Sequence, residues 1–234
     1  MRIAGIQKLT LLDFPEHIAA TIFTPGCDFR CPFCHNSELV LDNSETEYYV
    51  DEVIEFLKQR IGRLNGVAIT GGEPLMQSGI KDFIKTLREI GFKIKLDTNG
   101  SYPEKLKELL DEGLVDYVAM DIKNSPSEWA KTAGLSGEAA EILFKKSCES
   151  MQILKSLGID FEFRTTVVKG LHTKKSIEEM AEFIGPVDKY FLQNFEDSGA
   201  ILEDGYSGFS KEEMYEFLDA VKKHIPNAKL RGVD

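Results

Sequence analysis

Three cysteines and a histidine lie close together in the stretch PGCDFRCPFCHN, residues 25–36. Cys27, Cys31 and Cys34 have the spacing C-x3-C-x2-C, and His35 follows directly. Side chains of these types bind metal ions or carry electrons. Four chemistries use such a string: a covalently attached haem, a redox-active dithiol, a zinc site and an iron–sulfur cluster.

The spacing disfavours three of these four chemistries. A structural zinc site needs four ligands, and His35 directly follows Cys34, although neighbouring residues rarely reach one small ion. A dithiol of Cys31 and Cys34 would leave Cys27 without a role. Haem attachment through C-x-x-C-H belongs to exported proteins, and the first 20 residues lack the pattern of an export signal. An iron–sulfur cluster is therefore favoured, because three thiolates would bind three irons and leave the fourth open for catalysis.

Cys148 is the other cysteine of the chain. It lies four residues after Phe144 and three before Met151, on the apolar stripe of a predicted helix. We expect a small core residue there and not a fourth ligand. A fully thiolate-ligated cluster, as in a non-catalytic electron carrier, is accordingly disfavoured.

The composition limits the classes of partner. The chain has 28 Lys and Arg against 39 Asp and Glu, a net charge of −11, which repels phosphate backbones and anionic lipid. No run reaches the roughly 18 apolar residues that a membrane span requires. We expect a cytoplasmic protein without nucleic-acid or membrane partners, whose cysteines are ligands or core residues and not disulfides.

Strand and helix patterns alternate along the segments that must position the cysteines. Apolar, β-branched runs predict an edge strand at 2–9 and six strands at 19–24, 66–70, 93–98, 115–122, 160–168 and 189–195. Amphipathic stripes at 50–61 and 80–90 predict helices, and Ser210 with Glu213 forms a capping box before another. Such alternation predicts an α/β fold with a parallel sheet. Six units are too few for a closed eight-stranded barrel, so we expect one domain, residues 1–234, folded as a partial, open (β/α)6 barrel.

Polar residues follow the carboxyl ends of the predicted strands, where parallel α/β folds bind their ligands. The first predicted strand leads into the cysteine loop, and the next two lead into GGEP and DTNG. The fourth ends in Asp121 and is followed by Lys123, the fifth carries Arg164 and the sixth carries Gln193. One such residue could be a surface or capping residue, but polar residues at six adjacent strand ends around the cysteines predict a site.

These motifs together resemble those of the radical S-adenosylmethionine superfamily. CDFRCPFC, residues 27–34, has its C-x3-C-x-Φ-C signature with Phe33 as the aromatic Φ, and GGEP, residues 71–74, is similar to its second hallmark. The longer stretch LLDFPEHIAATIFTPGCDFRCPFCHN, residues 11–36, resembles the N-terminal part of anaerobic ribonucleoside-triphosphate reductase activating proteins. The activating enzymes of other glycyl radical enzymes are similar to a lesser degree.

The resemblance implies a chemistry and a set of binding residues. Cys27, Cys31 and Cys34 would hold a [4Fe–4S] cluster whose open iron chelates S-adenosylmethionine, and one electron would split it into methionine and a 5′-deoxyadenosyl radical. The backbone of Gly71, Gly72 and Glu73 would receive the methionine amino group, because a Cβ on the glycines would block that approach. Pro74 would also belong to the cofactor site. Phe33 would lie near the adenine. The rest of the cofactor, in some relatives with a monovalent cation, would contact Asp97, Asn99, Asp121, Lys123, Arg164 and Gln193.

The same resemblance implies partners. The substrate would be a glycine of anaerobic ribonucleoside-triphosphate reductase, and a ferredoxin or flavodoxin would donate the electron. Many larger activating enzymes carry further C-x2-C pairs that this sequence lacks, so we expect one cluster. Two alternatives stay open: activation of another glycyl radical enzyme, and a radical enzyme acting on a small molecule of the 7-deazaguanine type. Residues 196–210 match no functional pattern.

Overall fold

The computed structural model describes residues 1–41, 48–197, 199 and 201–233. Eight strands in the described part are hydrogen-bonded in sequence order. They are β1 (Gly5–Thr10), β2 (Ala19–Thr24), β3 (Gly66–Gly71), β4 (Lys93–Thr98), β5 (Tyr117–Asp121), β6 (Asp160–Val167), β7 (Tyr190–Asn194) and β8 (Lys229–Arg231). β1 pairs antiparallel with β2, whereas β2 to β4 and β6 to β8 are parallel. The order ends at β1 and β8, which confirms the predicted α/β class with a parallel sheet that does not close.

The predicted strands are all present, with some differences at their boundaries. The strand predicted at 115–122 is shorter and runs from Tyr117 to Asp121. The Asp116 carboxylate, just before it, accepts the N–H of Ile94 and pairs with Arg88. β8 was not predicted, since three residues are too few to show a period. The first predicted helix ends at Lys58, so Ile61 of its stripe lies beyond it and is 60% exposed.

Contacts along the chain divide it into two compact units. Unit 1 comprises residues 1–28, 38–119 and 147–160, and unit 2 comprises residues 29–37, 120–146 and 161–234. The cysteine loop contributes Cys27 to unit 1, and Cys31 and Cys34 to unit 2. That residues 1–234 form one domain stays a prediction.

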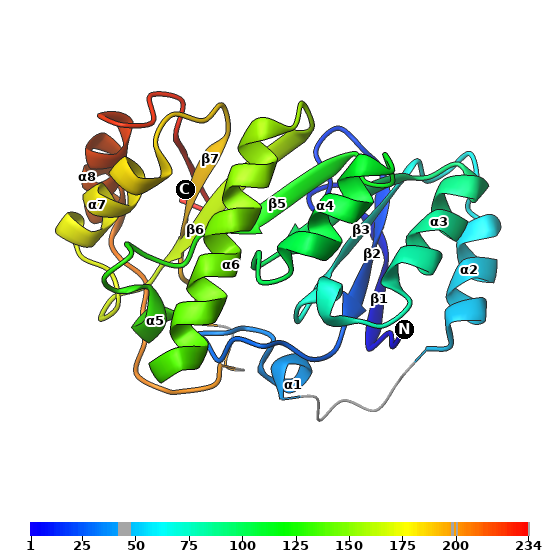
Figure 1. The fold of residues 1–234 in the computed structure, drawn as a ribbon, viewed down its shortest axis with the longest axis horizontal. Coiled ribbons are helices and arrows are strands. Elements are labelled where there is room, and N and C mark those ends of the chain that lie inside the picture. The colour runs from blue at the N-terminus through cyan, green and yellow to red at the C-terminus, as the bar shows by residue number, and fades with distance from the viewer. Residues whose placement is uncertain (42–47, 198, 200, 234) are drawn as a thin grey trace. The chain divides into compact units, whose positions relative to one another are not determined.

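Unit 1 is built on β1 to β4. Its helices are α2 (Val50–Lys58), α3 (Ile80–Ile90) and α4 (Pro103–Asp111), with most of the single turn α1 (Ser37–Val40) and the 3-10 turn η1 (Pro74–Met76). α2 and α3 lie side by side (Figure 1), and α3 buries the face that its stripe predicts. Thr24 pairs in register with Gly71, so the parallel strands bring the start of the cysteine loop next to the GGEP segment.

Unit 2 is built on β6 to β8. It contains α5 (Trp129–Thr132), α7 (Lys174–Ile184) and α8 (Lys211–Lys222), while α6 (Gly137–Ser156) has residues in both units. α7 and α8 pack side by side (Figure 1). The predicted capping box of α8 is confirmed, because the Ser210 N–H donates to Glu213 Oε2 at 2.8 Å and the Glu213 N–H donates to Ser210 Oγ at 3.2 Å.

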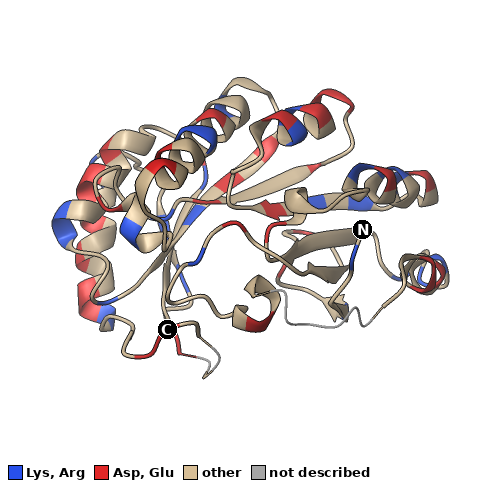
Figure 2. Cartoon of the chain, turned by 60° about the horizontal axis from the view of Figure 1, so that its bottom comes forward, with Lys and Arg blue, Asp and Glu red and all other residues tan. Residues whose placement is uncertain are grey.

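Charged residues gather on the helices, whereas the strands consist largely of other residues (Figure 2). The few charged side chains that are buried therefore stand out: Glu73, Lys95 and Glu162. Among the residues described, helices long and apolar enough to cross a membrane are absent.

Candidate active site

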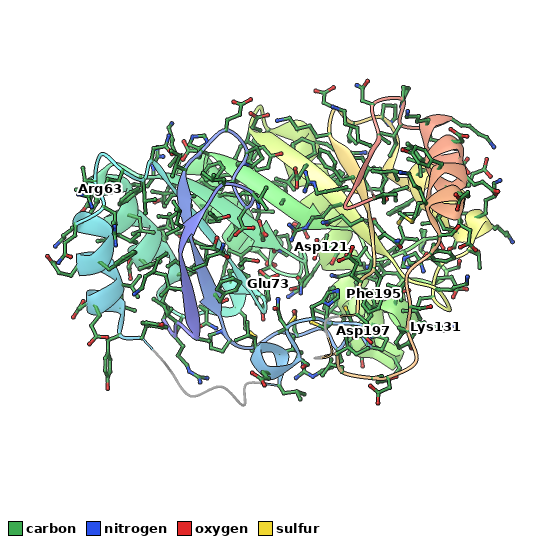
Figure 3. The ribbon with its side chains drawn as sticks, turned by 180° about the vertical axis from the view of Figure 1, so that it is seen from behind. Arg63, Glu73, Asp121, Lys131, Phe195 and Asp197 are labelled. Carbon is green, nitrogen blue, oxygen red and sulfur yellow. The ribbon has the colours of Figure 1, made fainter. Side chains whose placement is uncertain are left out.

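Glu73 follows β3 and connects the ends of two strands through its buried carboxylate (Figure 3). Its Oε1 accepts hydrogen bonds from the Leu75 N–H at 3.0 Å and the Thr98 hydroxyl at 2.9 Å, and its Oε2 accepts one from the Asn99 N–H at 2.7 Å. Burial raises the pKa of Glu73 to about 8, although these hydrogen bonds act in the opposite direction. Glu73 therefore holds the loops after β3 and β4 together.

Gly71 and Gly72 lie where two backbones approach closely. The Gly72 N–H donates to the Thr24 carbonyl at 2.8 Å. A Cβ on Gly72 would lie 1.9 Å from the Gly26 carbonyl oxygen, and a Cβ on Gly71 would lie 2.5 Å from the Thr24 backbone. Glycine is thus required here by packing within unit 1, which is a different reason from the expected approach of a ligand. Pro74, the last residue of the GGEP motif, is buried and begins η1, where its fixed φ suits the first position of a helical turn.

Asp97 lies at the end of β4 and is ion-paired with Lys95 of the same strand. The two residues share a face because they are two positions apart. The Asp97 Oδ2 also accepts the hydroxyl of Thr70 at 3.2 Å, which links β4 to β3. The pair compensates the charge of Lys95, whose side chain is only 4% exposed.

Asn99, in the loop after β4, contacts the first cysteine. Its side-chain NH2 lies 3.7 Å from Cys27 Sγ and 2.9 Å from Asp28 Oδ1. The sequence motif DTNG did not indicate this contact, since it joins loops 72 residues apart. In unit 1, the structure therefore places Asn99 between Cys27 and Glu73.

Cys31 and Cys34 lie in one turn of unit 2, closed by the Cys34 N–H donating to the Cys31 carbonyl at 3.0 Å. Cys31 is buried and Cys34 is half-buried. Burial raises the pKa of Cys31 to about 11 and also raises the pKa of Cys34, while the nearby charge of Lys123 acts in the opposite direction. Both side chains are therefore thiols at neutral pH, and binding a metal would require them to lose their protons.

Backbone contacts anchor this part of the cysteine loop. The Arg30 N–H donates to the Ala133 carbonyl at 2.9 Å, and a Cβ on Gly134 would lie 1.8 Å from the Arg30 carbonyl oxygen. The Pro32 carbonyl accepts the N–H of Glu203 at 2.9 Å. Part of the segment 196–210, for which the sequence indicated no role, thus contacts the cysteine loop.

Asp121, Lys123 and Arg164 form one ion-paired group in unit 2. Asp121 Oδ2 lies 3.0 Å from Lys123 Nζ, and Asp121 Oδ1 lies 2.5 Å from Arg164 Nε. Burial alone would raise the pKa of Asp121, but the charges of Arg164 and Lys123 hold it well below its usual range. Burial lowers the pKa of Lys123, and Asp121 more than reverses this effect. The group therefore carries two cations and one carboxylate.

Aromatic rings surround the last cysteine. Phe33 is buried and meets Phe195 edge to face, with ring centroids 6.2 Å apart. His35 stacks on the same Phe195 ring, with ring centroids 4.9 Å apart. Phe195, directly after β7, thus packs against the end of the cysteine loop within unit 2.

A cavity of 440 Å³ lies at the carboxyl ends of β6, β7 and β8. Thr166, Gln193 and Arg231 pair in register on the three strands and line it, together with His35, Asn194, Glu196, Asp197 and Gly232. Arg231 donates to both carboxylate oxygens of the buried Glu162 at 2.8 and 3.0 Å. Sequence reasoning named Gln193 but missed Arg231, because β8 gave no pattern, and it considered His35 only as a metal ligand.

The predicted site residues thus fall into two groups. Unit 1 holds Cys27, Gly71, Gly72, Glu73, Pro74, Asp97 and Asn99, and unit 2 holds Cys31, Phe33, Cys34, Asp121, Lys123, Arg164 and Gln193. Within the described ranges, no three His, Cys, Asp or Glu side chains are arranged to hold a metal ion. Cys148 lies on α6 and is half-buried, so the expected core position is met in part.

Comparisons with known proteins agree with the motifs. The model of the radical SAM superfamily matches residues 21–184. A protein of Methanocaldococcus jannaschii named "Putative glycyl-radical enzyme activating enzyme" is 31% identical over an alignment of 242 positions, gaps included, which covers 99% of this chain and 96% of that protein. The pyruvate formate-lyase-activating enzyme of Clostridium pasteurianum is 29% identical over 189 aligned residues, covering 78% of this chain and 76% of that enzyme.

Solved structures show the same fold. The structure of Streptococcus suis SuiB bound to its precursor peptide SuiA is similar with a TM-score of 0.68 and 14% sequence identity. The similar region covers 91% of this chain and 48% of that chain. This chain therefore spans about half the length of SuiB.

Proposed function

Because this chain belongs to the radical S-adenosylmethionine superfamily and, within it, to the glycyl-radical enzyme activating enzymes, we propose that it generates a glycyl radical on anaerobic ribonucleoside-triphosphate reductase. The observation that carries the proposal is the 31% identity to an activating enzyme over nearly the whole of both chains. The choice of reductase as partner is supported by the resemblance of residues 11–36 to the activators of that enzyme.

The residues present fit a [4Fe–4S] cluster held by Cys27, Cys31 and Cys34. Three thiols stand within one loop of eight residues, and thiolates are the usual ligands of such clusters. Each also has a group nearby that stabilises a thiolate: the Asn99 NH2 for Cys27, and the Lys123 charge for the other two. When bound and reduced, the cluster supplies the electron that splits S-adenosylmethionine into methionine and a 5′-deoxyadenosyl radical.

The chain's own residues bind and orient S-adenosylmethionine in this proposal. The group of Asp121, Lys123 and Arg164 offers two cations to the methionine carboxylate and one carboxylate to a hydroxyl or a cation. The remaining contacts come from Phe33, Gly71, Gly72, Glu73, Pro74, Asp97, Asn99 and Gln193. A monovalent cation beside the carboxylates of this set is part of the proposal.

The proposed chemical step is a hydrogen transfer. The 5′-deoxyadenosyl radical takes one hydrogen atom from the Cα of a glycine in the partner, which leaves 5′-deoxyadenosine and a glycyl radical. The electron that starts each cycle comes from a ferredoxin or flavodoxin. The glycine must reach the cofactor as part of a loop of the partner protein.

Electron paramagnetic resonance tests the function. The anaerobically reconstituted protein is mixed with S-adenosylmethionine, a reductant and the candidate reductase, and a glycine-centred doublet is expected. The doublet should vanish when the candidate glycine of the reductase is changed to alanine. A doublet with another glycyl radical enzyme and not with the reductase would correct the partner. Cofactor cleavage stimulated by a small molecule, with no doublet on any such enzyme, would favour small-molecule chemistry instead.

A further inference from the structure

Asn99 uses all the polar atoms of its backbone and its side-chain oxygen inside unit 1. Its N–H donates to Glu73 Oε2 at 2.7 Å, its carbonyl accepts the Ser147 hydroxyl at 3.2 Å, and its Oδ1 accepts the Ser101 N–H at 2.8 Å. The residue is 7% exposed. Contacts from the loop after β3, from α6 and from its own loop thus fix its position.

This network also fixes the orientation of the Asn99 amide. The Ser101 N–H can only donate, so the Asn99 atom that faces it must be the carbonyl oxygen. The NH2 group therefore points the other way, toward Asp28 Oδ1 at 2.9 Å and Cys27 Sγ at 3.7 Å. Its two hydrogens have two acceptors, one of which is a proposed cluster ligand.

The Asp28 carboxylate next to Cys27 makes the contact between the Asn99 NH2 and the Cys27 sulfur electrostatically important. Asp28 follows Cys27 directly, and its Oδ2 is a buried oxygen without a hydrogen-bond partner in the described part of the structure. A carboxylate beside a ligand sulfur disfavours the extra negative charge of a reduced cluster, whereas an N–H directed at the sulfur favours it. The Asn99 NH2 bonds both groups, so it offsets the carboxylate and donates to the sulfur.

We propose that Asn99 is a positioning residue that raises the reduction potential of the cluster through an N–H···S hydrogen bond to Cys27, with Glu73 holding Asn99 in place. This inference rests on the proposed function, because it requires Cys27 to bind the cluster. It assigns to Asn99 a role at the ligand sulfur, which is separate from contact with S-adenosylmethionine.

The decisive variant is Asn99→Asp, which keeps the shape of the side chain and an oxygen for the Ser101 N–H. It replaces the NH2 by a carboxylate oxygen that repels both Asp28 and the Cys27 sulfur. Potentiometric titration of the reconstituted protein, followed by electron paramagnetic resonance of the reduced cluster, should show a shift of the midpoint potential to more negative values. An unchanged potential at full iron content would overturn the proposal.

Two further variants keep the experiment interpretable. Ser150→Ala removes a 2.7 Å hydrogen bond from α6 to the Gly100 carbonyl in the same loop without touching Asn99 or Cys27, so its potential should equal that of the unchanged protein. Asn99→Ser removes the NH2 without adding charge, and it should also shift the potential to more negative values. It therefore provides the test if Asn99→Asp loses iron. A Ser150→Ala shift as large as that of the Asn99 variants, or iron loss from both Asn99 variants with the fold intact, would also overturn the proposal. Failure of the unchanged protein to bind iron would instead refute the proposed function.

Discussion

Arg231 of β8 and Glu162 of β6 form a bidentate ion pair, with N–O distances of 2.8 and 3.0 Å. The Arg231 guanidinium also lies 3.8 Å from the centre of the Phe191 ring. The Glu162 side chain is 2% exposed, so Arg231 compensates the charge of a buried carboxylate. The last strand, which has only three residues, is thereby tied to the core of unit 2.

Arg231→Ala should destabilise the protein, because it removes two hydrogen bonds and a compensating positive charge from the buried Glu162 carboxylate. Loss of hydrogen bonds to a charged group costs about 1.5–3 kcal/mol, and the partial exposure of Arg231 places the effect toward the lower end. Urea denaturation measures the free energy of unfolding. Glu162→Gln with Arg231→Ala should recover part of the loss, and an additive effect of the two changes would contradict the pairing.

Gly72→Ala should destabilise unit 1, since the added Cβ would lie 1.9 Å from the Gly26 carbonyl oxygen and the backbone must move. Overpacking of this kind costs about 1–3 kcal/mol or more. Gly158→Ala is the matched control, because a Cβ there has nothing within 4 Å. Thermal denaturation should show a lower Tm for the first variant only, and equal Tm values would argue against the close packing.

Cys27→Ser, Cys31→Ser and Cys34→Ser should each abolish the cluster, whereas Cys148→Ser should leave it intact. The reason is that Cys148 lies on α6, outside the cysteine loop. Iron analysis after anaerobic reconstitution should give about four irons per chain for the Cys148 variant. Iron loss from that variant with its circular dichroism unchanged would refute the ligand assignment.

Lys123→Ala should weaken S-adenosylmethionine binding by roughly 10-fold to 150-fold, corresponding to about 1.5–3 kcal/mol for a charge-assisted hydrogen bond. The fold should persist, because Asp121 keeps its contact with Arg164 at 2.5 Å. Lys131→Ala, on α5 of the same unit, is the control and should bind normally (Figure 3). Calorimetry showing equal affinities for both variants would place the cofactor elsewhere.

His172 should make the protein sensitive to acid. Burial lowers its pKa from 6.5 to about 4. Its Nδ1 accepts the Val168 N–H at 3.1 Å, which requires the neutral ring, and its Nε2–H donates to the Lys123 carbonyl at 2.8 Å. Because the folded pKa lies below the unfolded value, this stabilisation is complete above about pH 6.5 and is lost as the pH falls toward about 4. It amounts to about 3 kcal/mol.

Urea denaturation at several pH values measures this loss. His172→Gln should unfold with a smaller change in stability between about pH 6.5 and 4, since its amide does not titrate in this range. The difference between the two pH profiles gives the contribution of His172 to the free energy of unfolding, because carboxylates that titrate in the same pH range contribute equally to both proteins. Parallel profiles would show that His172 is not neutral in the folded protein.

Local patterns in the sequence predicted those features that depend on a few neighbouring residues. The strands around 19–24 and 93–98, the stripe of α3 and the Ser210 capping box follow from periodicity and from side-chain hydrogen bonds over three or four positions. The positions of Asp121 and Lys123 on one face follow from alternation along a strand.

Features that depend on residues far apart in the sequence could not be predicted from such local patterns. The contact of Asn99 with Cys27 joins two loops 72 residues apart, and the clash that requires Gly72 involves a carbonyl on another strand end. β8 is held by pairing with β7 and by Arg231, and three residues carry no period that would reveal it. These relationships arise only when the sheet is assembled.

The carboxylate of Glu73 restricts what can stand at its position. In its ionised form it accepts three donors at two oxygens, all of them within unit 1. Glutamine has the same length, but its NH2 would face either the Asn99 N–H or the Leu75 N–H and the Thr98 hydroxyl, placing donor against donor. The preference for glutamate comes from the hydrogen bonds that connect the loops after β3 and β4, and it does not depend on iron. A relative that lacked all three loop cysteines would still gain these three hydrogen bonds in unit 1 from a glutamate at this position.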